Sequence, residues 1–190
     1  MTIPELEDLL RDKLTVKSVS GLEKFPCANY AEYLAQDKAG QLDVLTAYDG
    51  EVVNILGLPV EKFMHIALSW AWILIALIML ILAFMKWNFF LLIGVPLALL
   101  GFMFSSPASM KAFGNTLVLV VTVYCIFSWV KGNQIAALLS GSYALSNYLT
   151  CVCRTYCDIV IRRSIDKSEL VLVWLVLKRC VVVYPKRSAV

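Results

Sequence analysis

The feature that most constrains this chain is a long block, residues 64–153, that is almost free of charge. Its only Lys, Arg, Asp or Glu residues are Lys86, Lys111 and Lys131, and each lies between two apolar runs. The first run, 64–85, rises by about 1.5 Å per residue as a helix, which is enough to span a hydrocarbon core about 30 Å thick. The block therefore predicts a membrane unit with several spans.

Short connections between the apolar runs predict how the spans pair. The links at 86–88 and 131–134 leave room only for tight turns, so the helices on either side should be antiparallel neighbours. We therefore predict an all-α membrane bundle of four transmembrane helices, arranged as two tight helical hairpins, with a small α+β extramembrane part. The predicted spans are 64–85, 89–104, 113–130 and 135–153.

The composition favours a membrane protein. Of the 190 residues, 60% are hydrophobic and only 16% are charged, whereas about a quarter of the residues in a soluble protein are charged. The first apolar run begins only at residue 64, so no N-terminal signal peptide is expected. Charges are divided unevenly between the ends: residues 1–62 carry eleven acidic and six basic residues, and residues 154–190 carry three acidic and eight basic residues.

The segment before the block, 1–63, is predicted to be an acidic extramembrane segment. It should contain helices and a β-hairpin at 42–56, because Asp49-Gly50 readily supplies the positive φ angles of a type I′ turn.

The segment after the block, 154–190, is predicted to be a basic extramembrane tail. Its apolar stretch at 170–184 is rich in β-branched and aromatic residues, which favour strands. A helix that begins after Asp166 is the alternative, because periodicity alone does not assign short apolar runs. If both termini lie on one side of the membrane, these strands can join the predicted hairpin in one small sheet.

The distribution of Lys and Arg near the span ends predicts the topology. With four crossings, Lys86 and Lys131 lie on one side, and six basic residues lie on the other. Those six are Lys62, Lys111, Arg154, Arg162, Arg163 and Lys167. With three crossings, the residues close to the spans balance. Because cytoplasmic loops carry the excess of positive charge, we predict four crossings with both termini cytoplasmic.

Small residues predict where helices approach each other closely. Gly94 and Ala98 lie four residues apart in the second span, and Ala136, Ser140 and Ala144 repeat that spacing in the fourth. These residues are the expected helix-packing interface.

Pro96 and Asn147 allow an alternative use of the same spans. Pro96 removes one helical hydrogen bond and should kink the second span. Asn147 belongs to a weakly polar stripe that also contains Ser140, Tyr143 and Thr150. A packing face and an inert kink explain these residues, and a pore lining in an oligomer is the alternative.

The inventory of reactive side chains is small. His65 is the single histidine, and Glu61 lies one helical turn before it, which fits an interfacial polar pair or, alternatively, a proton relay or half a metal site. For Cys151, Cys153 and Cys157 the alternatives are buried thiols, lipidation, and soft-metal or redox chemistry. The sequence contains no phosphate-binding loop and no nucleophile elbow. We therefore expect no catalysis, no cofactor and no bound metal.

These observations favour a non-catalytic multi-pass membrane protein that acts as an interaction, assembly or accessory subunit of a membrane complex. Its expected partners are other membrane protein subunits or a second copy of itself, together with membrane lipids whose anionic headgroups the basic tail would contact. No nucleic-acid partner is expected. A homo-oligomeric channel or permease is the first alternative, and a membrane-bound thiol or metal protein is the second.

Overall fold

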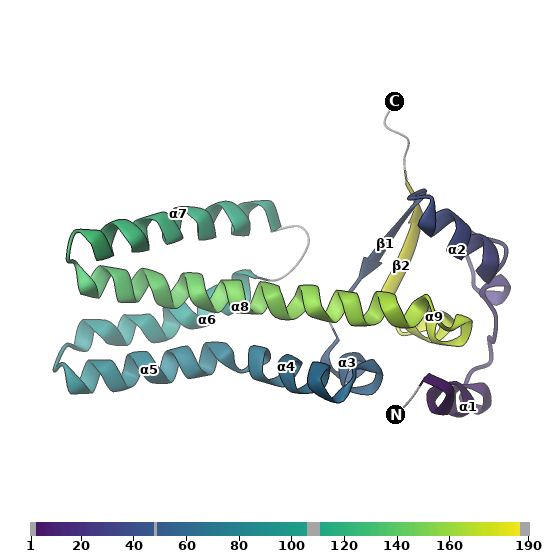
Figure 1. Ribbon diagram of the computed structural model, residues 1–190, viewed down its shortest axis with the longest axis horizontal. Coiled ribbons are helices and arrows are strands. Elements are labelled where there is room, and N and C mark those ends of the chain that lie inside the picture. The colour runs from purple at the N-terminus through teal and green to yellow at the C-terminus, as the bar shows by residue number, and fades with distance from the viewer. Residues whose placement is uncertain (1–2, 48, 106–110, 187–190) are drawn as a thin grey trace. The chain divides into compact units, whose positions relative to one another are not determined.

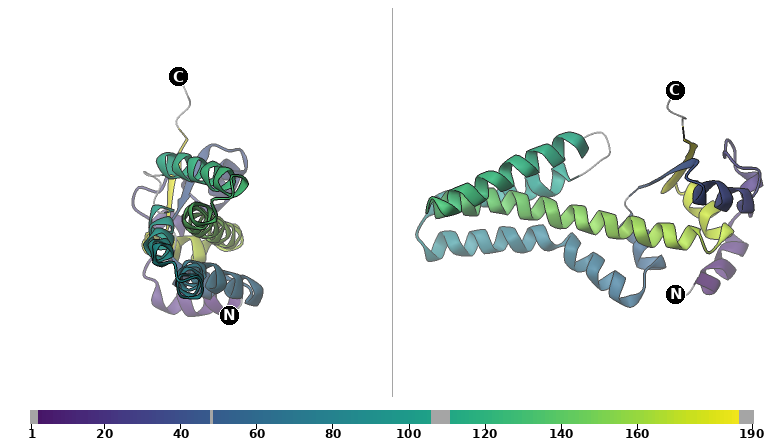
Figure 2. Two further views of the ribbon diagram at one scale, coloured as in Figure 1. Left: turned by 90° about the vertical axis from the view of Figure 1, so that its left-hand side faces the viewer. Right: turned by 45° about the horizontal axis from the view of Figure 1, so that its top comes forward.

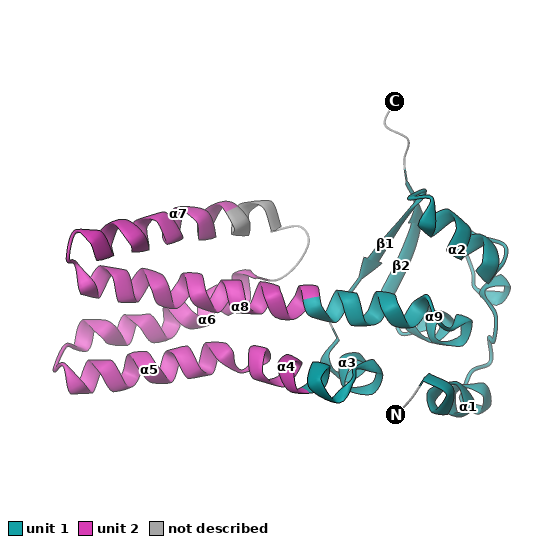
Figure 3. Cartoon of the chain, in the orientation of Figure 1, with its two compact units in different colours: residues 1–62, 156–190 teal, residues 63–155 magenta. Residues whose placement is uncertain are grey.

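The computed structural model describes residues 3–47, 49–105 and 111–186, except for the side chains of 111–115 (Figure 1). The chain is mostly helical, and it forms two compact units (Figure 3). We name residues 1–62 together with 156–190 the terminal unit, because both ends of the chain build it. We name residues 63–155 the apolar unit. Helices α4 (Pro59–Ser69) and α8 (Gln134–Ile165) contribute residues to both units.

The terminal unit contains short helices around one small sheet. Its remaining elements are α1 (Ile3–Lys13), η1 (Val19–Gly21), α2 (Tyr30–Lys38), β1 (Leu42–Thr46), α3 (Gly50–Leu56), α9 (Glu169–Leu177) and β2 (Val181–Pro185). Strand β1 pairs with β2 in antiparallel register, so that Val44 lies opposite Val183. Along both strands buried and exposed residues alternate, as expected for a sheet with one face on a core. The sheet therefore joins a segment before the apolar block to one after it.

The predicted hairpin at 42–56 is wrong in its second half. Asp49 does not begin a turn; its carboxylate accepts the backbone N–H groups of Glu51 at 2.9 Å and Val52 at 3.3 Å. This is the N-cap of α3, and it satisfies donors that a helix start otherwise leaves unpaired. Residues 50–56 are therefore helical, and β2 takes the place beside β1 that the second hairpin strand was predicted to fill.

The apolar stretch at 170–184 is a helix followed by a strand. Ser168 caps α9 by accepting the N–H of Val171, so the helical alternative holds for residues 169–177 and the strand prediction is wrong there. Helix α9 is apolar on all sides, as is usual for a helix enclosed by its own domain. Its buried residues are Val171, Leu172, Val173 and Leu175. Only β2, at the end of this stretch, is extended.

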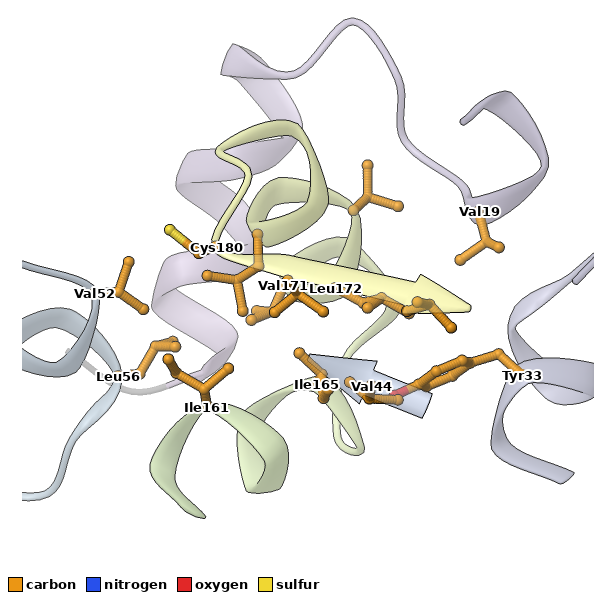
Figure 4. Packing of buried hydrophobic residues seen from close by; sticks show 14 of the residues in the cluster. Val19, Tyr33, Val44, Val52, Leu56, Ile161, Ile165, Val171, Leu172 and Cys180 are labelled. Atoms are coloured by element: carbon orange, nitrogen blue, oxygen red, sulfur yellow. The ribbon is translucent and has the colours of Figure 1, made fainter. Parts of the chain in front are cut away.

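One hydrophobic core holds the terminal unit together (Figure 4). Leu6 and Leu10 bury the apolar stripe of α1 in this core, and α1 packs on α9. Full burial of each large apolar side chain contributes about 1.5 to 3 kcal/mol. The Tyr30 hydroxyl also donates to the backbone carbonyl of Ile165 at 2.6 Å, which ties α2 to the end of α8.

The apolar unit contains two antiparallel helical hairpins. The first joins α5 (Ala71–Met85) to η2 (Phe89–Ile93) and α6 (Gly94–Phe104), and the second joins α7 (Lys111–Val130) to α8. Pro96 was predicted to kink the second span, and it lies in the first turn of α6, directly after the change from 3-10 to α-helix. A proline is tolerated there because its missing N–H has no helical partner.

The described helices differ in whether they are long enough to cross a membrane. Helix α8 is long and apolar enough to span a membrane, and a second span exists if α4 and α5, bent by 41° at Trp70, count as one. The segments Phe89–Phe104 and Thr116–Val130 are apolar but shorter. One or two helices can therefore span by length and composition, where the sequence predicted four.

Candidate functional site

The most specific polar structure in the apolar unit is a line of donors on α8 that face backbone carbonyls of α6. The Ser146 hydroxyl donates to the Ala98 carbonyl at 2.7 Å, and the Asn147 amide donates to the Gly101 carbonyl at 3.0 Å. Both donors are buried. Hydrogen bonds between helices form at only one alignment of the two backbones, and they stabilise helix association in apolar surroundings. This pair therefore fixes the register of α6 against α8. We name Ala98, Gly101, Ser146 and Asn147 the polar seam.

Arg154 continues the line beyond the polar seam. Its guanidinium donates to the carbonyl of Ser105, just past the end of α6, at 2.7 Å. The last carbonyls of a helix have no partner within the helix, and a cation there also interacts favourably with the helix dipole. Arg154 thus caps α6 from the side of α8.

Gly101 explains why the two backbones come so close. A Cβ atom at this position would collide with the backbone carbonyl of Tyr143 and lie 3.1 Å from Cβ of Ser146. Since a backbone atom cannot rotate away as a side chain can, only glycine fits here. Gly101 was not among the packing residues predicted from the sequence, although it lies one helical turn after Ala98.

The predicted packing residues take different positions in this interface. Ala98 is fully buried, and a Cβ at Gly94 would collide with the side chain of Met79, so both lie where α6 is tightly enclosed. Ala136 and Ala144 are only half-buried on α8. The Ser140 hydroxyl donates to the carbonyl of Ala136 at 2.7 Å, within its own helix.

Other hydroxyls of α8 are also bonded to backbone. Ser142 donates to the Leu139 carbonyl at 2.8 Å, and Thr150 donates to the Ser146 carbonyl at 2.8 Å. Of the polar stripe that the sequence offered as an alternative pore lining, Ser140, Asn147 and Thr150 are therefore engaged in hydrogen bonds inside the protein. The buried Tyr143 hydroxyl has no hydrogen-bond partner among the described residues.

A neighbouring side of α8 faces α7 through weaker contacts. Cys125 on α7 directs its thiol to the Ala137 carbonyl at 3.3 Å. A shallow hollow of about 270 Å³ lies between the two helices. It is lined by Val118, Leu119, Thr122, Asn147, Tyr148 and Cys151. Its lining is mostly apolar, so it offers few groups with which to bind a polar ligand.

The three predicted reactive cysteines differ in their surroundings. Cys151 is half-buried, with its thiol 3.5 Å from the side-chain oxygen of Asn147. Cys153 is buried, and its thiol lies 3.8 Å from the carbonyl of His65. Within the apolar unit the side chains of His65 and Cys153 can offer two metal-ligand atoms less than 4.8 Å apart. Cys157 is a buried thiol in the α8 segment of the terminal unit.

Glu61 has a partner that the sequence analysis missed. In the terminal unit its carboxylate accepts two hydrogen bonds from Arg163, at 2.7 and 2.8 Å, and one of its oxygens also accepts the N–H of Leu58. A bidentate pair of this kind combines charge with fixed geometry. No sequence signal brings these two residues together, because about a hundred residues separate them.

A second charged cluster in the terminal unit surrounds the start of α3. Burial by itself would raise the pKa of Asp49. Hydrogen bonds from Lys178, the Val52 N–H and Cys180, together with the charge of Lys178, outweigh burial and lower this pKa. Burial, and then the bond to Asp49, raise the pKa of the Cys180 thiol. Cys180 is therefore a neutral, buried thiol at physiological pH.

Comparison with known proteins gives no relative: no family model, curated protein or solved structure matches this chain. The described geometry offers a closely packed helix pair, a capped helix end and a folded terminal unit.

Proposed function

We propose that this chain is a non-catalytic multi-pass membrane protein that acts as an interaction, assembly or accessory subunit of a membrane complex. The observation that carries the proposal is the inverted polarity of the apolar unit. Its polar side chains at Ser146 and Asn147 are buried and bonded, while most of its exposed surface comes from large apolar side chains that its helices leave uncovered. A protein in water shows the reverse arrangement.

The outward apolar side chains occur on every helix of this unit. Monomers in water rarely expose contiguous apolar surface of more than a few hundred Å². Examples are Leu74, Ile78, Ile81 and Phe84 on α5, Leu99, Leu100 and Met103 on α6, Leu119, Val123, Ile126 and Phe127 on α7, and Leu145 and Tyr148 on α8. Lipid tails, or the apolar surface of a membrane partner, would cover this surface.

The sheet of the terminal unit supports an even number of crossings. Strands β1 and β2 are hydrogen-bonded neighbours, so in a membrane-bound chain we expect residues 42–46 and 181–185 on the same side of the bilayer. The chain between them must then cross an even number of times. An even number excludes a chain in which α8 is the only crossing. It favours two or four crossings with both termini on one side.

The hydrogen bonds of α8 favour an assembly role over a channel. A water-filled pore needs polar groups that face its lumen. In this chain the hydroxyls of Ser140, Ser142, Ser146 and Thr150 donate to backbone carbonyls. These four hydroxyls already have partners within the protein, and the buried Tyr143 hydroxyl is the exception among the described residues of the stripe.

The proposal is tested by extraction and by assembly. The protein should stay with the membrane in alkaline carbonate, migrate on native gels as a complex, and conduct no ions or small solutes after reconstitution. Replacing both Ala136 and Ala144, which are half-buried on α8, by Leu should break the complex. Ala67→Leu is the matched control, since Ala67 is exposed on α4.

Two results would contradict the proposal. One is release of the protein by carbonate, which would remove the membrane assignment. The other is solute flux through vesicles that contain the purified protein alone, which would favour the channel.

A further inference from the structure

The two hairpin tips of the apolar unit are the same turn built twice. Each follows the pattern Lys-x-Asn: Lys86-Trp87-Asn88 after α5 and Lys131-Gly132-Asn133 after α7. The Asn88 N–H donates to the Ala83 carbonyl at 3.0 Å, and the Asn133 N–H donates to the Ser128 carbonyl at 2.8 Å. Each asparagine side chain then accepts an N–H group of the next helix. These are the bonds of a Schellman end followed by an N-cap.

The middle residue of each turn has a positive φ angle, as this turn requires. Gly132 adopts φ 76°, which costs a glycine nothing. Trp87 adopts φ 49°, and for a bulky residue this is an outlier. At equivalent positions the second tip thus has Gly132, which suits a positive φ angle, and the first tip has Trp87, which is strained by it.

The side chain of Trp87 gives the fold little packing in return for that strain. It is 83% exposed, and Trp129 near the second tip is 66% exposed. Lys86 and Lys131 are exposed beside them. Both turns lie at the same end of the apolar unit (Figures 1 and 2). That end therefore presents two tryptophans and two cations, and residues 64–153 contain no acid to oppose them.

We propose that this tip surface, formed by Lys86, Trp87, Trp129 and Lys131, binds the phosphate-bearing headgroups of a phospholipid leaflet. Indole rings sit at the headgroup level because one edge is polar and the body is apolar, and lysine ammonium groups pair with lipid phosphates. The positive charge of the surface favours anionic lipid by about fivefold per lysine. The inference rests on the proposed membrane location, and it specifies the surface and its partner.

The test uses the full chain in mixed micelles of detergent with either phosphatidylcholine or phosphatidylglycerol, and it follows the midpoint of thermal unfolding. Phosphatidylglycerol should raise the midpoint of the wild-type protein more than phosphatidylcholine does. In the double variant Lys86→Gln/Lys131→Gln that difference should become clearly smaller, while the midpoint in pure detergent changes little. The double variant Lys13→Gln/Lys38→Gln removes the same charge from exposed sites of the terminal unit and should keep the difference.

Trp87→Gly separates binding from folding. Because Gly132 occupies the equivalent site, this variant should be at least as stable as wild type in pure detergent and should lose part of the midpoint rise that lipid causes. A Trp87→Gly protein that unfolds earlier in pure detergent would show that Trp87 supports the fold instead. A full phosphatidylglycerol response in Lys86→Gln/Lys131→Gln would also overturn the proposal. Either result, in a protein that resists carbonate extraction, leaves the membrane assignment intact, so the two failures can be told apart.

Discussion

Adding one methyl group at Gly101 should separate α6 from α8. In Gly101→Ala the new Cβ meets the backbone carbonyl of Tyr143, so the helices must move apart. The hydrogen bonds from Ser146 and Asn147 to α6 are then stretched or lost. Each such bond contributes about 0.6 to 2 kcal/mol, and overpacking costs about 1 to 3 kcal/mol. Alanine regains about 1 kcal/mol of helix propensity. With two such bonds affected, the net loss should be about 1 to 6 kcal/mol.

Two other glycines of the same unit provide the comparison. A Cβ at Gly141 lies 3.4 Å from the Cys125 thiol, so Gly141→Ala should change the unfolding free energy by less than about 1 kcal/mol. A Cβ at Gly94 meets the flexible Met79 side chain, so Gly94→Ala should fall between the two.

The assay is equilibrium unfolding in detergent micelles by added dodecyl sulfate, followed by circular dichroism. The expected order of destabilisation is Gly101, then Gly94, then Gly141. The close approach at the polar seam is refuted if Gly101→Ala unfolds at the same dodecyl sulfate concentration as the wild type. It is also refuted if Gly141→Ala is the most destabilising of the three variants.

Three further predictions concern the terminal unit. Glu61→Gln should cost about 1 to 3 kcal/mol, because Arg163 loses a charged, bidentate partner; an unchanged thermal midpoint would show that the pair adds nothing. Tyr30→Phe should cost about 1 kcal/mol through the lost bond to the Ile165 carbonyl, and a denaturation curve that overlays wild type would exclude this contribution. Asp49 has a lowered pKa, so its charge stabilises the fold above its ordinary pKa of 3.8, and that stabilisation is lost as the pH falls through the lowered value. Asp49→Asn keeps a capping oxygen and should lose only this acid-dependent part in a pH titration of stability, whereas Asp49→Ala should lose a further 0.5 to 2 kcal/mol, about the value of an N-cap.

The four apolar runs predicted as helices are mostly helical, but two segments outside them were misassigned for a definable reason. An Asp-Gly pair can form a hairpin turn, or it can begin a helix with Asp as the N-cap and Gly as the first helical residue. Which of the two structures forms depends on the segment that pairs with β1. Here β2, from the far end of the chain, pairs with β1, so Val52 and Val53 enter the core from a helix. The Val-rich stretch of α9 has strand propensity, but enclosure by the core and the Ser168 cap override it.

The polar seam was predictable only in part. Asn147 and Ala98 were visible in the sequence as a polar residue and a small residue on apolar helices. Their alignment depends on the register of α6 against α8, which short turns constrain but do not define. Gly101 and Ser146 follow only from that register, and the Glu61–Arg163 pair follows only from the tertiary fold. The number of crossings likewise depends on β1 pairing with β2, a contact between distant segments.

The measurement that tests the central claim most directly is the sidedness of the two ends of the chain. The native thiols Cys27 and Cys180 are 4% and 5% exposed, so they would label poorly. Cysteines introduced at the exposed positions Lys13 and Lys186 should be used instead, with a membrane-impermeant maleimide in sealed, oriented vesicles. Pairing of β1 with β2 predicts that both positions label from the same side. Labelling from opposite sides would mean an odd number of crossings and would contradict both the sheet and the membrane topology built on it.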